Sequence, residues 1–223
     1  MSTKDSAAAV YTYEKDPAAI YRRSFETVRA EADFTGLPAD LHPVAIRLIH
    51  ACGMTDIAGD LAWSDDVVTS AEAALGGGAP ILCDVEMVAH GVIRDRLPAH
   101  NKVLCSLNDA DVPALAKRLG TTRSAAATEH WRDVLAGAVV AIGNAPTALF
   151  HLLEMIAAGG PRPAAILGFP VGFVGAAESK DALADNPFGL PYLVLKGRRG
   201  GSAMAAAAVN ALAAGLPEEA GHA

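Results

Sequence analysis

Residues 138–147 read AVVAIGNAPT, and this stretch decides the fold. Its first five residues form an unbroken apolar run, which is typical of a strand buried on both faces of a parallel sheet. Gly143 ends the run, Asn144 can cap a helix, and Pro146 suits a first helical turn. The stretch therefore predicts a buried strand that passes directly into a helix.

The same unit recurs on both sides of this stretch. Further apolar runs predict strands at 80–83, 103–107, 164–167 and 192–195. The helices expected between and after the strands are 84–92, 109–135 (as two helices), 145–158, 175–185 and 201–213. A repeated strand–helix–strand unit implies right-handed crossovers and a parallel sheet. We therefore predict an α/β fold of three layers, with a mostly parallel sheet of about five strands and helices on both faces.

The chain before this repeat is expected to form a helical N-terminal region. Candidate helices within the first 78 residues are 17–33, 41–52 and 65–75, packed on the sheet or across a partner subunit. Residues 1–12 and 215–223 are interpreted as flexible tails. Residues 13–214 are then expected to form a single domain.

The composition argues against several functional classes. A net charge of −7, no long Lys/Arg run and only 5% aromatic residues argue against nucleic-acid binding. No apolar segment reaches the roughly 20 residues that a membrane span needs, and the first ten residues lack the core of a signal peptide. Three cysteines without a CxxC pair indicate reduced thiols in a cytoplasmic protein. Since 52% of the residues are hydrophobic and 19% charged, some apolar surface is expected in an oligomer interface.

Four strand–helix junctions carry residues that suit an anionic ligand. In an open parallel sheet, ligands bind outside the carboxyl ends of the strands, where helix N-termini attract anions. The residues expected to hold anions there are Arg123, Asn144, Lys180, Arg199 and Ser202. Each junction alone also fits an ordinary turn with a solvated side chain. Together they predict a ligand with several carboxylates.

His50, near the end of an apolar helix, is the best candidate for acid–base chemistry because imidazole titrates near neutral pH. The alternative is a core histidine bonded to a backbone carbonyl. Asp84, Glu86 and His90 could form a metal cluster, but Asp84 is more simply interpreted as a cap of the following helix. No HExxH and no GxSxG motif supports a metal-dependent or serine hydrolase.

As an ordered set, these motifs resemble the precorrin-8X methylmutase family. The resemblance covers most of residues 13–213, and residues 168–180, GFPVGFVGAAESK, are among its most specific parts. The other matching stretches are 19–25, 49–53, 78–84, 122–126, 140–147 and 200–204.

The resemblance implies an isomerase of cobalamin biosynthesis. Its substrate would be a tetrapyrrole-derived macrocycle, precorrin-8X, whose methyl group moves from C-11 to C-12 in a formal [1,5]-sigmatropic shift that gives hydrogenobyrinic acid. His50 matches the family's catalytic histidine and Ser24 its substrate-contacting serine. No metal ion and no organic cofactor are expected, and a homodimer with the pocket near the interface is implied.

Three other functions remain to be weighed. A cobalt-precorrin-8 methylmutase of the anaerobic route would differ little in sequence. A non-catalytic corrinoid carrier could use the same anion-holding loops. A nucleotide-binding oxidoreductase is disfavoured, because the glycines of residues 168–175 are spaced GxxxGxxG rather than GxGxxG.

Overall fold

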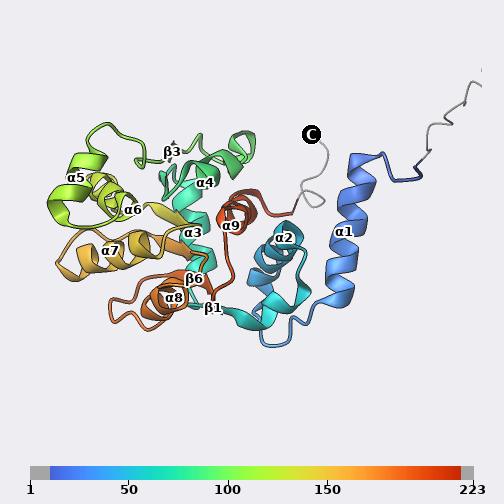
Figure 1. Cartoon of the computed structure of the whole chain (residues 1–223). Helices are drawn as coiled ribbons and strands as arrows, with labels where there is room; N and C mark the ends of the chain where they lie inside the picture. The colour runs from blue at the N-terminus through green and yellow to red at the C-terminus, as the bar shows by residue number, and fades with distance from the viewer. Residues whose placement is uncertain (1–10, 217–223) are drawn as a thin grey trace, which may run out of the picture.

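The computed structural model describes residues 11–216 and shows a six-stranded sheet wrapped by helices (Figure 1). The strand order is β1-β6-β5-β4-β2-β3. The strands are β1 (Leu61–Trp63), β2 (Ile81–Cys83), β3 (Val103–Leu104), β4 (Val139–Ile142), β5 (Ala165–Gly168) and β6 (Tyr192–Leu195). The tails predicted at 1–12 and 215–223 lie largely outside the described residues.

Strands β2 to β6 pair in parallel, which confirms the predicted α/β class. Strand β1 is the exception, since it runs antiparallel to β6 and was not predicted, so the count of about five strands becomes six. Its residues fall in the region expected to be helical. Three residues are too few to show a period of two, and β1 exists because Ala62 pairs with Val194 far along the chain.

The helices agree with the predicted pattern. They are α1 (Pro17–Glu31), α2 (His42–Cys52), α3 (Val67–Gly76), α4 (Glu86–Gly91), α5 (Val112–Leu119), α6 (Arg123–Ala127), α7 (Pro146–Ala157), α8 (Ala176–Ala184) and α9 (Ser202–Ala214). Short 3-10 turns are η1 (Ala39–Leu41), η2 (Thr55–Asp60), η3 (Arg94–Arg96) and η4 (Thr128–Trp131). The interval 109–135 contains α5, α6 and η4, so the two helices predicted there are present but short.

Two separate apolar cores confirm that helices cover both faces of the sheet. Alternate strand residues, such as Val139 and Val140, belong to different cores. One core contains buried side chains of α2, α3, α4 and α9, and the other contains those of α7, α8 and η4. This is the three-layer arrangement expected when parallel strands are buried on both faces.

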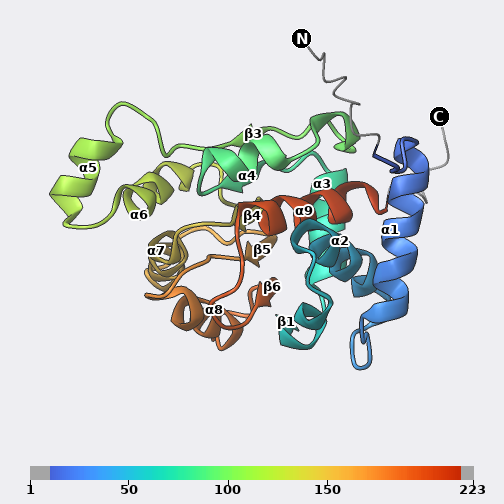
Figure 2. The same ribbon diagram turned by 45° about the vertical axis from the view of Figure 1, so that its right-hand side comes forward.

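Helices α1 and α2 add a layer outside α9 on one side of the molecule (Figure 2). Helix α2 packs along α9, and α1 packs on α2. Phe25 of α1 is fully buried in this contact, together with Leu48 and Ile49 of α2. The N-terminal helices therefore form a surface next to α9 that is separated from the sheet.

Candidate active site

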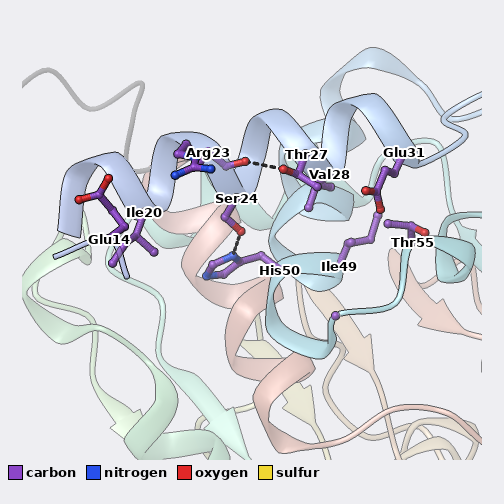
Figure 3. A pocket seen from close by; sticks show the side chains of 11 residues that line it. Glu14, Ile20, Arg23, Ser24, Thr27, Val28, Glu31, Ile49, His50 and Thr55 are labelled. Atoms are coloured by element: carbon purple, nitrogen blue, oxygen red, sulfur yellow. Dashed lines mark hydrogen bonds between the residues drawn. The ribbon is translucent and has the colours of Figure 1, made fainter. Parts of the chain in front are cut away.

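Ser24 and His50 meet between α1 and α2. Ser24 Oγ lies 2.7 Å from His50 Nδ1, across 26 residues of sequence (Figure 3). Helix α2 ends at Gly53, whose left-handed φ of 70° lets the chain turn away just beyond the histidine. On the side of α1, the ring of Phe25 meets the imidazole edge-on at 5.1 Å, and that of Tyr21 lies at 5.6 Å. These contacts fix the plane of the imidazole.

The second ring nitrogen of His50, Nε2, has no hydrogen-bond partner within residues 11–216. When the ring is protonated, Nδ1–H donates to Ser24 Oγ, and the proton on Nε2 can pass to a ligand, which leaves a neutral imidazole. Burial lowers the pKa of His50 below its ordinary value of 6.5, and the positive charge of Arg47 lowers it further. The arrangement can therefore deliver a proton in a fixed direction.

A cavity of about 450 Å³ opens beside this pair, between α1 and α2. Its lining includes Arg23, Ser24 and His50 together with the apolar Ile20 and Ile49 (Figure 3). Two acidic side chains, Glu14 and Glu31, also face it. His50 is thus not a closed core histidine, because it borders open space.

His50 also lines a second cavity of about 270 Å³, bounded by α2, α9 and the segment after α4. A third cavity of about 360 Å³ lies beyond the end of α2, where Met54 faces Val171 and Gly200. Arg198 and Arg199 line this third cavity, and the Arg198 guanidinium lies 5.5 Å from the centre of the exposed Phe173 ring. Open spaces therefore surround the C-terminal half of α2.

The five residues predicted to hold anions do not line either cavity beside His50. Arg199 pairs with Asp56, at 2.6 Å, and with Asp60, both in η2. Lys180 is fully buried, and its Nζ donates to the Arg199 carbonyl at 2.7 Å. Burial lowers the pKa of Lys180 to about 8. These two residues therefore join the loop after β6 to η2 and α8.

The remaining three lie at other loops. Arg123 Nη2 donates to the carbonyl of Leu107 and to Asn108 Oδ1, each at 3.1 Å. Asn144 is exposed in the turn after β4. Ser202 begins α9 against that turn, because a Cβ on Gly143 would lie 2.7 Å from the Ser202 Cα.

Asp84 was expected to cap its own helix, and this was wrong. Its carboxylate accepts backbone N–H groups of Gly143, Asn144 and Ala145 at 2.8 to 2.9 Å. Burial raises the pKa of Asp84, while the three N–H donors oppose that shift. Asp84 therefore anchors the turn after β4, whereas neither it nor Asn144 caps α7, whose N-cap has no side-chain hydrogen bond.

Within residues 11–216, no three His, Cys, Asp or Glu side chains are grouped so as to hold a metal ion. Along the same residues, no helix combines the length and apolarity required to cross a membrane.

Comparison with known proteins identifies the family. Residues 19–214 match the family model described as CbiC, precorrin-8X methylmutase. The chain belongs to this family. It is an isomerase of cobalamin biosynthesis, as the resemblance in sequence implied.

Relatives within the precorrin-8X methylmutase family match most of the chain. A precorrin-8X methylmutase of Pseudomonas aeruginosa is 65% identical over 90% of this chain and 97% of its own length. One of Sinorhizobium sp. is 60% identical over 91% and 97%. The crystal structure of a precorrin-8X methylmutase from Thermus thermophilus superposes with a TM-score of 0.79, at 39% identity, covering 87% of this chain and 94% of the other.

Arg47 is the residue that the sequence interpretation overlooked. It precedes His50 by three residues, so both project from neighbouring positions on α2. It is also buried, with 7% of its surface exposed. An arginine within the apolar run of residues 44–49 was the available signal, since an amphipathic helix places its charges on the solvent face.

Proposed function

We propose that this enzyme moves the methyl group of precorrin-8X from C-11 to C-12, giving hydrogenobyrinic acid, with His50 as the general acid. One observation carries the proposal: an imidazole held by Ser24, with its Nε2 unpartnered, beside a cavity of about 450 Å³. A methyl shift within one molecule needs no nucleophile. A proton donated to the macrocycle makes the ring electron-poor and lowers the barrier to migration.

The surroundings of His50 suit this role. Ser24 and the rings of Tyr21 and Phe25 fix the imidazole before the ligand arrives, so little reorganisation is needed at the moment of transfer. Ile20 and Ile49 beside the pair make part of the cavity wall apolar. Since the pKa of His50 is lowered, its protonated form is a stronger acid than free imidazolium.

The names of the relatives favour the metal-free ring. The two relatives at 60% and 65% identity are precorrin-8X methylmutases, whereas those of Priestia megaterium and Leptospira interrogans, at 34% and 35%, are cobalt-precorrin-8 methylmutases. We infer that precorrin-8X is the natural substrate. Assaying the purified enzyme with both rings separates the alternatives: faster turnover of the cobalt-containing ring would contradict the inference.

We also infer that the enzyme acts as a homodimer in the cytoplasm. A cavity of about 450 Å³ encloses only part of a macrocycle with its side arms, so the rest must lie against another surface. Ile20 and Tyr21 of α1, which are 46% and 42% exposed next to His50, offer an apolar surface for a second subunit. All three cysteines are free thiols, which suits a reducing compartment.

The decisive experiment replaces the proton donor. His50→Ala is expected to lower kcat by about 10²–10⁴, the usual contribution of a general acid, while the folded protein still binds hydrogenobyrinic acid. The change in the visible spectrum of the ring on isomerisation provides the assay. Wild-type turnover by a folded His50→Ala variant would refute the acid role, and binding without turnover by the wild type would point to a carrier.

The five anion-holding residues remain predictions, and Arg199 offers the clearest test. Charge reversal in Arg199→Glu should weaken binding of hydrogenobyrinic acid by about tenfold or more while changing kcat less. Because Arg199 also pairs with Asp56 and Asp60, Arg199→Gln is the matched control for the loss of the ion pairs alone. Equal affinity of the Arg199→Glu variant and the wild type, measured by fluorescence titration, would count against a role in binding.

A further inference from the structure

Arg47 is a buried cation for which residues 11–216 supply no ion-pair partner. Its residue is 7% exposed, its Nε atom has no hydrogen-bond partner, and no carboxylate within residues 11–216 forms an ion pair with it. Burying a charge is costly unless it is paired. An unsatisfied buried polar group in a folded protein is a reason to look for a missing ligand.

The place for such a ligand is the 270 Å³ cavity that Arg47 and His50 both line, here named the Arg47 cavity. Its opposite wall is the alanine-rich face of α9, represented by Ala206, and the chain at Gly91 and Ile93. None of the residues that line it is acidic. A cavity of this size admits one short side arm of a ligand but not a macrocycle.

The wall opposite Arg47 is rigid. Asn210 Oδ1 accepts the Ile93 N–H at 2.8 Å, and Asn210 Nδ2 donates to the Gly91 carbonyl at 2.9 Å. A Cβ on Gly91 would lie only 2.6 Å from the Ala206 Cβ, so α4 and α9 are in the closest possible contact there. Asn210 therefore uses its polar atoms on the wall itself, and the cavity is a built feature rather than a gap between loose segments.

The charge of this region favours an anion. Arg96 is a cation whose charge acts on Arg47, and its guanidinium donates to the carbonyls of Ala214 and Gly215. Two cations thus lie near the Arg47 cavity of a chain whose net charge is −7. A planar guanidinium also matches a carboxylate through two parallel hydrogen bonds, which a lysine cannot form.

We propose that Arg47 binds one side-arm carboxylate of the macrocycle in the Arg47 cavity and so holds the ring across His50. The inference rests on the proposed function and deepens it, because it names a binding residue and a subsite for that substrate. His50 lines both cavities, so an arm fixed at Arg47 leaves the ring itself at the 450 Å³ cavity, beside the free Nε2. Arg47 is then a residue that determines position and specificity.

The first test compares Arg47→Met with Arg94→Met in binding hydrogenobyrinic acid. Arg94 is exposed in η3, close in sequence to the wall of the Arg47 cavity, so its replacement removes a nearby charge without the subsite. Loss of a buried charge pair should raise Kd about 30-fold or more for Arg47→Met and by far less for Arg94→Met. Equal effects of the two substitutions, or no effect, would overturn the proposal.

A second ligand tests whether a carboxylate is what Arg47 recognises. Hydrogenobyrinic acid with its side arms converted to amides should bind the wild type more weakly, and Arg47→Met should cost little further affinity for it. An equal loss for acid and amide would show that Arg47 acts through the fold. A variant that is monomeric where the wild type is dimeric would show that Arg47 pairs with the partner subunit, which also overturns the proposal.

A third measurement is independent of the macrocycle. Sodium propionate should raise the Tm of the wild type above that in sodium chloride of equal ionic strength, and Arg47→Met should abolish the difference. If the wild type fails to bind the corrinoid but shows this propionate effect, the proposed function fails and the carboxylate subsite stands. A propionate effect that is identical in wild type and Arg47→Met contradicts the subsite itself.

Discussion

At the scale of single residues, two neighbours of His50 affect different properties of its imidazole, namely the orientation and the pKa. Ser24 fixes the ring through Nδ1, and Arg47 lowers the pKa because its positive charge opposes protonation. Ser24 thus sets the direction in which the imidazole points, and Arg47 contributes to its acidity. An enzyme of this kind can therefore lose activity through either residue while the imidazole itself is intact.

The pKa of His50 should rise in Arg47→Met. Burial, the larger cause of the lowered pKa, remains, but removal of a neighbouring positive charge favours the protonated imidazole, so the midpoint of its titration moves up toward the ordinary value of 6.5. If the protonated ring is the active acid, kcat/KM falls as pH rises through this pKa, and the fall should occur at higher pH in the variant.

NMR titration of the His50 ring protons measures this pKa directly, with His42 as an internal reference in the same helix. An unchanged or lower midpoint in Arg47→Met would contradict the role given to the Arg47 charge.

The sequence predicted some of these residues and not others, for physical reasons. His50 was assigned from its place near the end of an apolar helix and Ser24 through the family resemblance, but their contact across 26 residues depends on how α1 packs on α2. Asp84 was wrongly assigned as a helix cap because the three N–H donors that it binds lie 59 to 61 residues away, in the turn after β4. Arg47 was missed because one residue type alone does not tell whether its charge faces solvent or a cavity.

At the scale of secondary-structure elements, continuous apolar runs predicted five strands, and the stretches between and after them were assigned to helices. Strand β1 was not predicted because it is defined by its pairing with β6, which lies far away in the sequence. The predicted strand at 103–107 has only Val103 and Leu104 in the sheet, since β3 is an edge strand with a single neighbour. Edge elements are thus the ones that local pattern describes least well.

Gly143 should be intolerant of a side chain. A Cβ at this position would lie 2.7 Å from the Ser202 backbone and 2.7 Å from a methyl of Val88, so the turn after β4 would be pushed from α9. Gly143→Ala is expected to destabilise the fold by about 1–3 kcal/mol, as measured by urea unfolding. Gly76→Ala is the control, because a Cβ there meets nothing within 4 Å. Equal stability of the two variants would contradict this packing.

At the scale of the whole molecule, the candidate site is displaced from the centre of the sheet edge. The sequence placed ligand-binding loops at the carboxyl ends of the strands, and Arg198 and Arg199 do line a cavity there, at the end of α2. His50, the proposed acid, comes from a layer outside α9, which no parallel-sheet rule predicts. The fold class was therefore easier to predict than the position of the chemistry.

The chain should form a dimer in solution through the face that carries α1. Sedimentation is expected to give about twice the chain mass of 22.9 kDa, and Ile20→Glu should shift the mass toward the monomer. Leu119→Glu is the matched control, because Leu119 of α5 is 44% exposed against 46% for Ile20. A wild type that is monomeric at all concentrations, or equal effects of the two variants, would contradict this assignment.

Because of its position, α1 affects both the access of a ligand to the larger cavity and the orientation of the His50 imidazole. This helix lies on the outside of α2 and supplies both a wall of the larger cavity and the hydroxyl that orients the imidazole. A movement of α1 away from α2 that enlarged this cavity would also lengthen the Ser24–His50 contact. With α1 displaced, His50 would lose the hydrogen bond that orients its imidazole. The proposed proton transfer therefore requires α1 to be packed against α2 while the substrate is bound.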